Sequence, residues 1–338
     1  MRNATNLANL IAGVKRPPSF HSELQILYGD ADMSLAIDRA LAALKQQVRR
    51  LVYWGLQPTL IVLALALPLS GASEDSHFLF WFGVLGVLTL LEILIPARPD
   101  WQGTLSEKSA LFGFVIVAFF AYGFFEGLFD QTVFPWLASV REQLGLDIWP
   151  SDWPLLVQVL LIFASYEFVN YWYHRGAHRW GWLWKLSGHG THHAFKNLTA
   201  LNTLANHPFE PVFLLLPRML VGFLLGGEVV SVAVGSLFMV TTLMTHTNLE
   251  LNSKLIGLFF TTNRYHIHHH SMVRDESNTN YGCACILWDR VFGTFADADT
   301  EETGIGHRQP TYTEMYLMPF REPKSSAVAP LRGVTDNA

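Results

Sequence analysis

Charged residues are scarce in this chain of 338 residues: Asp, Glu, Lys and Arg make up 15% of it, against about 25% in a typical soluble domain. Hydrophobic residues account for 50%, and the mean hydropathy is +0.24. This composition excludes an ordinary soluble protein and indicates a membrane protein. The net charge of -5 comes with no basic patch, which argues against a nucleic-acid partner.

Several familiar signals are also missing. The 2 cysteines, Cys283 and Cys285, stand one residue apart, which predicts no disulfide between them. The sequence has no glycine-rich phosphate loop or other nicotinamide or flavin pattern, and no His-Glu-x-x-His motif. Residues 1–20 lack the long apolar core and the cleavage site of a signal peptide, so we interpret them as mature sequence.

Long hydrophobic runs are present instead. A transmembrane helix needs about 20 mostly apolar residues, and runs that qualify cover 52–73, 77–97, 109–125 and 154–173. A further apolar region, 211–245, is interrupted by Arg218 and by several glycines. We expect two helices in a hairpin there, or one helix followed by a re-entrant one.

Lysine and arginine flank these runs unevenly, which predicts their orientation. We expect the N-terminus, the 98–108 loop and everything after residue 174 to face the cytoplasm. Residues 1–50 and 301–338 are predicted to be flanking segments of a membrane domain at 51–300. The absence of a C-terminal retrieval signal favours a bacterial inner membrane over the endoplasmic reticulum.

Histidines crowd into the second half of the sequence. Positions i, i+3 and i+4 of a helix share one face, and this spacing occurs in "HGTHH" and again in "HIHHH". The segment "YWYHRGAH" adds a pair four residues apart, and "MTHTNLEL" adds one more. Nine histidines are thus predicted to converge on one side of the membrane: His174, His178, His189, His192, His193, His246, His266, His269 and His270.

So many imidazoles favour a metal centre over packed or pH-sensing histidines, because neighbouring imidazoles would repel each other once protonated. One zinc takes four ligands, or three at a catalytic site, so nine suit two metal ions; imidazole itself is compatible with iron, copper, zinc or nickel. The predicted fold class is therefore an all-α integral membrane protein. It has about four transmembrane helices plus the hairpin or re-entrant pair, and a cytoplasmic histidine-rich cap that holds two metals.

Three more residues are candidates for contacts with the ligands. Glu167 lies two turns before His174 and is predicted to accept a ring N–H from a ligand histidine; an interfacial carboxylate with no such role is the alternative. His268 falls off the shared helix face, which places it behind the ligands or at the surface. His207 is a further candidate, although a packed histidine with no role at the metal is the favoured interpretation.

The segments "YWYHRGAH", "HGTHH", "NRYHIHHH" and "LWDRVFGTF" resemble the fatty acid hydroxylase superfamily, also called the sterol desaturase family, over roughly residues 80–300. The resemblance implies an integral membrane, non-haem di-iron oxygenase that hydroxylates or desaturates lipids with O2. It implies electrons from a separate ferredoxin, cytochrome or reductase. The implied iron ligands are His174, His178, His189, His192, His193, His266, His269 and His270, with His246 matching a position found in part of the family.

Two other functions remain open from the sequence. A zinc-dependent membrane hydrolase is disfavoured by the missing His-Glu-x-x-His motif and by the number of histidines. A non-enzymatic metal carrier would place its ligands at the membrane midplane, whereas these histidines gather at helix ends.

Overall fold

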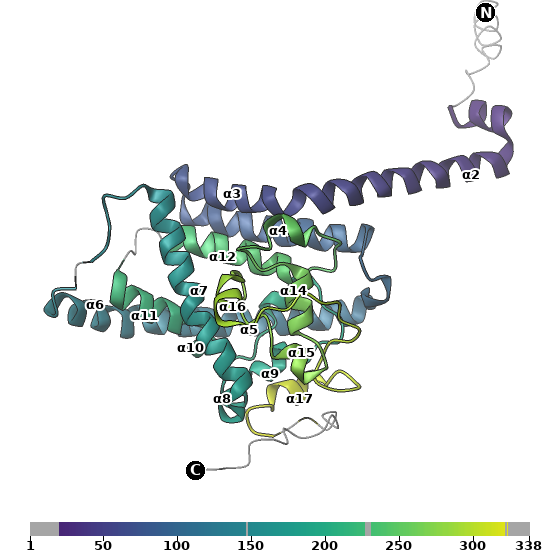
Figure 1. The fold of residues 1–338 in the computed structure, drawn as a ribbon. Helices are drawn as coiled ribbons and strands as arrows, with labels where there is room; N and C mark the ends of the chain where they lie inside the picture. Colours follow the sequence, from purple (N-terminus) through teal and green to yellow (C-terminus); the bar gives the residue numbers. More distant parts are fainter. Residues whose placement is uncertain (1–19, 147, 227–230, 322, 324–338) are drawn as a thin grey trace, which may run out of the picture. The chain divides into compact units, whose positions relative to one another are not determined.

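The computed structural model describes residues 20–321 and 323, apart from 147 and 227–230. Helices make up all the regular structure of the described residues (Figure 1), with isolated bridges at Phe260–Cys285 and Ser271–Thr303. The predicted all-α fold is confirmed. The described residues divide into two compact units, one that ends at Arg50 and one that begins at Leu51, and the division into flanking segments and a membrane domain stays a prediction.

Among the described residues, 4 helical stretches are long and apolar enough to cross a membrane: Ser34–Leu69, Asp75–Leu94, Leu105–Gln143 and Leu155–Arg179. They are built from α2 (Phe20–Leu51), a π-helical turn η1 (Val52–Leu56), α3 (Gln57–Leu69), α4 (Glu74–Leu94), α5 (Leu105–Gln131), α6 (Val133–Gln143) and α7 (Leu155–Arg179). Large apolar side chains such as Leu79 and Phe120 point outward from α4 and α5, as expected for surfaces that face lipid. The predicted number of spans is therefore confirmed.

The predicted apolar pair after these spans is also present, as α11 (Leu216–Leu225) and α12 (Ser231–Thr245), preceded by the short α10 (Pro211–Leu214). Both α11 and α12 pack on α7, and α12 also packs on α3 and α4. The connection at 227–230, and with it Glu228, lies outside the described residues. Helix α12 ends at Thr245, so the loop that begins with His246 starts at the end of this helix bundle.

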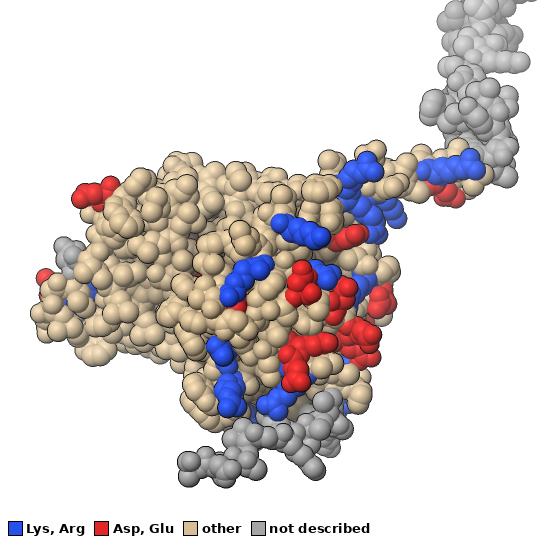
Figure 2. Space-filling view, viewed as in Figure 1, with Lys and Arg blue, Asp and Glu red and all other residues tan. Residues whose placement is uncertain are grey.

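Short helices lie beside the C-terminal half of α7 in Figure 1, to its right, and α8 continues from its lower end. They are α8 (Gly181–Ser187), α9 (His189–His192), η3 (Ala200–Leu204), α13 (Ser253–Ile256), α14 (Asn263–His269), α15 (Arg274–Ser277), α16 (Leu287–Phe292) and α17 (Tyr312–Tyr316). Charged side chains are concentrated over the region of α14 and α15, while the face over α3 and α12 is almost free of them (Figure 2). This polarity fits a helical bundle in lipid with a polar cap at one end.

Residues beyond 301, predicted as a flanking segment, contribute to the core of the cap. Met315 and Met318 are buried together with Phe114 of α5 and Phe195. Thr191 of α9 donates a hydrogen bond to the Met315 carbonyl at 3.1 Å. Helix α17 therefore holds α9, and with it the histidines of that segment, against the membrane helices.

Gly188 separates α8 from α9 with a positive φ of 72°. A Cβ atom at this position would lie 2.4 Å from Cγ of His207, so only glycine allows both the left-handed turn and the close approach of the imidazole. The Ser-Gly pair before His189 is thus the hinge that turns α9 toward the bundle.

Glu92 joins α4 to two loops of the cap. Its buried Oε1 accepts hydrogen bonds from the Ala200 amide at 2.8 Å, the Thr247 hydroxyl at 2.7 Å and the Asn248 amide at 2.8 Å. Hydrogen bonds to a charged acceptor are the strong ones. One carboxylate therefore fixes the loop that follows α12 and the start of η3.

We expect Glu92→Ala to lower the free energy of unfolding by about 3 kcal/mol, because it leaves three buried donors without their acceptor. Glu92→Gln should be clearly milder, since its Oε1 can still accept from all three. Thermal unfolding of the purified protein in detergent, followed by circular dichroism, measures the difference. Equal melting temperatures for Glu92→Ala and the wild type would contradict this role.

Candidate metal centre

Nine histidines meet in the cap as two adjacent groups, and within each group the potential ligand atoms all lie within 4.8 Å of one another. The five-histidine group consists of His174, His178, His189, His193 and His269; the four-histidine group consists of His192, His246, His266 and His270. Eight of the nine side chains are buried. The ninth, His178, is partly exposed and borders a pocket that opens to the surface. These are the nine residues that the spacing predicted would converge.

Each His-x-x-His-His segment contributes to both groups. In the α9 segment, the first and last histidines, His189 and His193, join the five-histidine group, and the middle one joins the other. In the α14 segment, His266 and His270 join the four-histidine group and His269 crosses over. Within the shared face of a helix, the side chains at i and i+4 lie one above the other, and the side chain at i+3 is displaced to one side. Each segment therefore contributes histidines to both groups.

His174 and His269 show how the rings are oriented. The His174 Nδ1 atom lies 2.6 Å from the Tyr281 carbonyl, and the His269 Nδ1 atom lies 2.7 Å from the Thr279 carbonyl. A carbonyl oxygen only accepts, so both Nδ1 atoms must carry the proton. The two Nε2 atoms then present lone pairs to each other at 2.9 Å. This arrangement is repulsive between neutral rings and becomes favourable when a cation lies between them.

The four-histidine group repeats the pattern. The His246 Nδ1 atom lies 3.2 Å from the Thr242 carbonyl, and its Nε2 atom lies 3.1 Å from Nε2 of His192 and 3.1 Å from Nε2 of His266. His270 Nε2 lies 3.2 Å from His266 Nε2. One proton cannot satisfy so many facing nitrogens at once, whereas a single metal ion can accept all their lone pairs.

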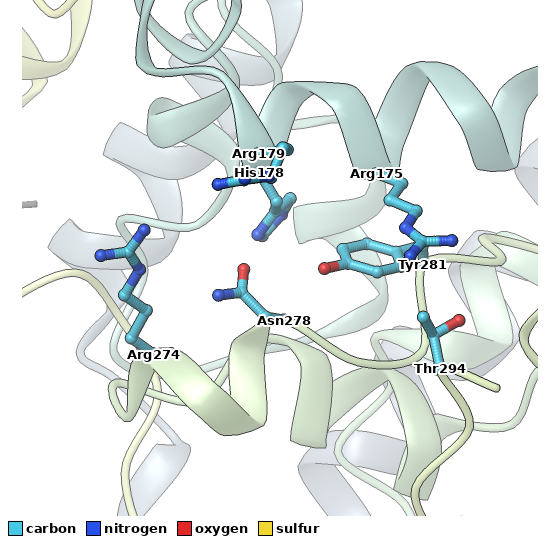
Figure 3. Close-up of a pocket in the computed structure, with 7 residues that line it drawn as sticks. All are labelled: Arg175, His178, Arg179, Arg274, Asn278, Tyr281 and Thr294. Atoms are coloured by element: carbon cyan, nitrogen blue, oxygen red, sulfur yellow. The ribbon is translucent and has the colours of Figure 1, made fainter. Parts of the chain in front are cut away.

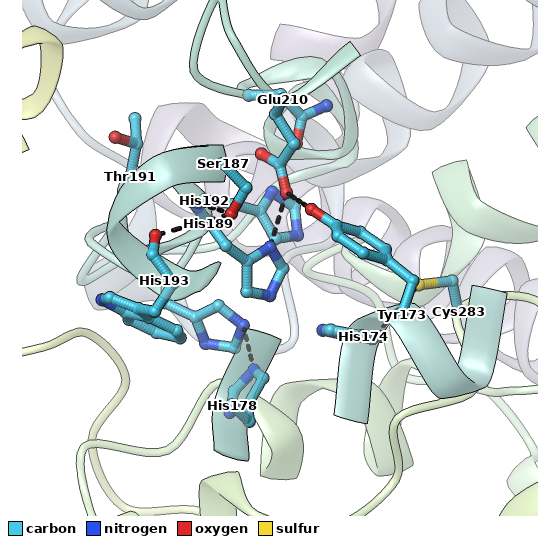
Figure 4. A network of polar contacts seen from close by, with 12 residues as sticks. Tyr173, His174, His178, Ser187, His189, Thr191, His192, His193, Glu210 and Cys283 are labelled. Carbon is cyan, nitrogen blue, oxygen red and sulfur yellow. Dashed lines mark hydrogen bonds and ion pairs between the residues drawn. The ribbon is translucent and has the colours of Figure 1, made fainter. Parts of the chain in front are cut away.

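Glu210 is a residue of the site that the sequence analysis did not single out. Its Oε1 lies 2.6 Å from His189 Nδ1 and also accepts from the Tyr173 hydroxyl at 3.5 Å (Figure 4). His189 Nε2 is buried and has no hydrogen-bond partner among the described residues. A carboxylate behind one ring nitrogen and a free second nitrogen is typical of a metal-ligating histidine. The only signal in the sequence was the acidic residue in "ANHPFE".

The predicted bond from a ligand histidine to Glu167 is corrected by the structure. Glu167 accepts from the amides of Ala284 and Cys285 at 2.7 and 2.8 Å and from the Asn170 side chain at 3.2 Å. It thus orients the loop whose Tyr281 carbonyl accepts from His174. The partner is a backbone carbonyl because the loop, and not α7 itself, lies behind the imidazole.

The other two candidates lie outside both groups. His207 accepts from the Phe209 amide at 3.1 Å and donates to the Tyr316 carbonyl at 3.2 Å, which makes it a packed histidine. His268 is buried and contacts the Thr300 hydroxyl at 3.1 Å. Cys283 and Cys285 are both free thiols, as predicted.

Burial keeps these imidazoles neutral. It lowers the pKa of His246 to about 4 and that of His269 to about 3. The pKa values of His192, His193, His266 and His270 also fall well below the ordinary range, first through burial and then through the neighbouring histidines. Neutral imidazole is the form that binds metal, so the site is ready to bind cations at neutral pH.

The metal-free protein should lose stability as the pH falls from about 6.5, the ordinary pKa of histidine, toward the low folded-state values of His246 and His269. In that interval the unfolded chain binds protons that the folded chain excludes. Asp289, whose pKa burial raises to about 6, opposes the trend but is one group against several.

The melting temperature of chelator-treated protein should fall by roughly 5 °C or more between pH 7.5 and pH 5, since ~1 kcal/mol moves it by about 2–4 °C at this chain length. His269→Gln removes one titrating ring and should flatten the slope. A melting temperature that stays constant over this range would refute the account.

Comparisons with known proteins agree with the geometry. The family model described as fatty acid hydroxylase matches residues 159–294, the stretch that contains all nine histidines. No solved structure matches the chain.

Three relatives show the breadth of the likeness. The chain is 31% identical to an ornithine lipid hydroxylase of Rhizobium tropici over 233 residues, 66% of this chain and 69% of that one. It is 26% identical to the human alkylglycerol monooxygenase over 174 residues, covering 49% of this chain and 35% of that one. It is 28% identical to the lathosterol oxidase of Rattus norvegicus over 185 residues, 50% of this chain and 60% of that one. The chain therefore belongs to the fatty acid hydroxylase family of lipid-acting membrane oxidoreductases.

Proposed function

We propose that this protein is a membrane-bound di-iron oxygenase that hydroxylates a polar lipid with O2 and external electrons. The observation that carries the proposal is the set of facing Nε2 atoms, above all the 2.9 Å approach of His174 and His269 with both Nδ1 atoms bonded to carbonyls. Such facing lone pairs are stable only around cations. The family membership supplies the reaction class.

One iron is assigned to the five-histidine group and the second to the four-histidine group. Bound there, iron supplies the activation of O2 that C–H oxidation requires. The residues of the chain orient the imidazoles. In four of the rings, those of His174, His269, His246 and His189, the Nδ1 atom is held by the carbonyl of Tyr281, Thr279 or Thr242 or by the carboxylate of Glu210, so that Nε2 points to the proposed metal position.

Hydroxylation consumes one lipid C–H bond, one O2, two electrons and two protons, and yields one C–OH group and one water. The sequence contains no nicotinamide or flavin pattern, so we assign the two electrons to a separate ferredoxin, cytochrome or reductase. Hydroxylation is preferred to desaturation because two of the three relatives described above are named for hydroxylase or monooxygenase activity. A cytoplasmic position of the cap, in a bacterial inner membrane, is proposed from the lysines and arginines that flank the spans.

Metal analysis of the detergent-purified protein tests the centre directly. We expect about two irons per chain, matching the two histidine groups, with strong losses in His269→Ala and in His246→Ala. His307→Ala, which alters an exposed histidine outside both groups, is the control and should keep its iron.

Expressing cells should contain lipids that have gained one oxygen atom, and these should be absent in the His269→Ala strain. One tightly held zinc and an O2-independent product would replace the proposal with the hydrolase. Metal accumulation with unchanged lipids would replace it with the carrier.

Glu210→Ala should weaken iron binding by about 10- to 100-fold, because the His189 ring loses the acceptor that fixes its tautomer and orientation. Iron retention against increasing chelator concentration measures the effect. Glu302→Ala removes an exposed carboxylate that pairs with Lys196 at the surface and is the matched control. Wild-type iron retention in Glu210→Ala would refute the positioning role.

A further inference from the structure

A pocket of about 250 Å³ opens beside the five-histidine group (Figure 3). It is lined by Arg175, His178, Arg179, Arg274, Asn278, Tyr281 and Thr294. His178 belongs both to this pocket and to the histidine group. In Figure 3 the His178 ring, the Asn278 amide and the Tyr281 hydroxyl point toward one another across its middle, with arginines on either side. Whatever binds in the pocket therefore lies next to the proposed metal position.

The pocket is strongly positive. Its lining includes three arginines and no acidic residue, and none of the three makes an ion pair with a carboxylate within the described part of the chain. Arg175 influences Asp289 electrostatically, but Asp289 is buried and its oxygens accept from the Tyr281 and Gly282 amides and the Thr294 hydroxyl. Arg175 also donates a hydrogen bond to the Tyr171 hydroxyl at 3.0 Å. This partner is neutral, so the guanidinium charges remain available to an anionic ligand.

The position of the arginines points to a ligand from the membrane. Arg175 and Arg179 lie on the last two turns of α7, directly after the apolar part of a candidate span. Arginines at this position lie where an apolar helix leaves the hydrocarbon and meets the lipid headgroups. The pocket is smaller than the ~300–1,000 Å³ that drug-sized ligands occupy, so it suits a headgroup and not a complete lipid.

An exposed aromatic strip leads from the pocket along the same helix. Phe168, Trp172 and Arg175 follow each other at i, i+4 and i+7 on one face of α7, and the two aromatic rings are 38% and 44% exposed. The Arg175 guanidinium lies 5.4 Å from the Trp172 ring centre, and Phe292 of α16 packs 5.1 Å from the same ring. A hydrocarbon chain can lie on this strip while a charged group enters the pocket.

We propose that the pocket binds the anionic headgroup, a phosphate or a carboxylate, of the lipid that this enzyme oxidises, with the hydrocarbon chain on the aromatic strip of Phe168, Trp172 and Phe292. The inference rests on the proposed function for the oxidation itself. Guanidinium groups suit both anions because their paired N–H donors match two oxygens. His178 at the inner side of the pocket then places the oxidised carbon in or close to the headgroup, and not at the far end of the chain.

An acidic electron-donor protein is the competing occupant of a positive surface. The concave shape and the small volume favour the lipid, because a docking protein needs a wide surface, about 800 Å² on each partner in a stable complex.

Equilibrium binding to the full chain in phosphatidylcholine nanodiscs tests the proposal, with and without iron. The probes are hexadecyl phosphate, N-hexadecanoylglycine, uncharged hexadecanol and inorganic phosphate. We expect the double variant Arg179→Gln/Arg274→Gln to bind both anionic lipids at least about tenfold more weakly than the wild type, since two charge-assisted contacts are lost. Hexadecanol should bind equally to both proteins, and inorganic phosphate should bind far more weakly than hexadecyl phosphate.

Two further variants guard against a folding artefact. Arg179→Lys/Arg274→Lys keeps the charges and should recover most of the affinity, while Arg321→Gln removes an exposed arginine outside the pocket and should change nothing. Unchanged binding of the anionic lipids in the glutamine variant would overturn the proposal, as would an equal loss for hexadecanol.

Two more outcomes would assign the pocket to another ligand. Inorganic phosphate binding as tightly as hexadecyl phosphate would make it a site for a soluble anion. Unchanged lipid binding together with slower reduction by an acidic donor protein would make it a protein-docking site. A wild-type protein that binds anionic lipids but holds no iron would refute the di-iron function and leave the headgroup site standing.

Discussion

Nine imidazoles lie together in this protein, and many of their Nε2 atoms face one another. The surrounding structure has to hold these rings in place against the repulsion between their lone pairs. This arrangement is unfavourable for neutral rings, because rotating one ring of each facing pair would relieve the repulsion between the two lone pairs. Three of the rings, those of His174, His269 and His189, are prevented from turning by bonds at their Nδ1 atoms, to the carbonyls of Tyr281 and Thr279 and to the carboxylate of Glu210. Burial then removes water as an alternative partner and holds the pKa of His269 low. The fold therefore keeps the facing nitrogen atoms of these histidines available to a cation, because it removes their other hydrogen-bond partners.

Two buried carboxylates on the membrane helices α7 and α4 hold the loops that surround the histidine groups. Glu167 orients the loop that carries the Tyr281 carbonyl, and Glu92 fixes the loop that follows His246. Each is a buried carboxylate that accepts backbone amides, so each binds a cap segment to a helix that spans the bilayer. These two acidic residues thus position the cap without belonging to either histidine group. Met315 of α17 and the following Met318 pack behind α9 and contact its Thr191 side chain.

The crossed contribution of the two His-x-x-His-His segments has a functional consequence. Because the α9 and α14 segments each supply histidines to both groups, neither group can move without the other, and their separation is set by two helices at once. The pocket at His178 opens at the end of α7, where the apolar span meets the charged cap. A lipid can therefore reach the centre without leaving the bilayer completely, which is the main difficulty for an enzyme whose substrate is insoluble.

Composition and spacing alone determined the membrane class, the number of apolar spans and the nine histidines that converge, because hydrophobic length and helix periodicity are local properties of the chain. The division into groups of five and four was not predictable, since the three histidines of each segment were expected to point together and a one-residue difference in helical phase sends His192 and His269 to the opposite group. Glu210 and the actual contacts of Glu167 depend on loops that pack across long sequence separations. The arginine pocket joins α7 to residues about a hundred positions later. These features were decided by tertiary structure. A buried polar side chain bonds to whichever group the fold brings within reach, and no local pattern in the sequence specifies that group.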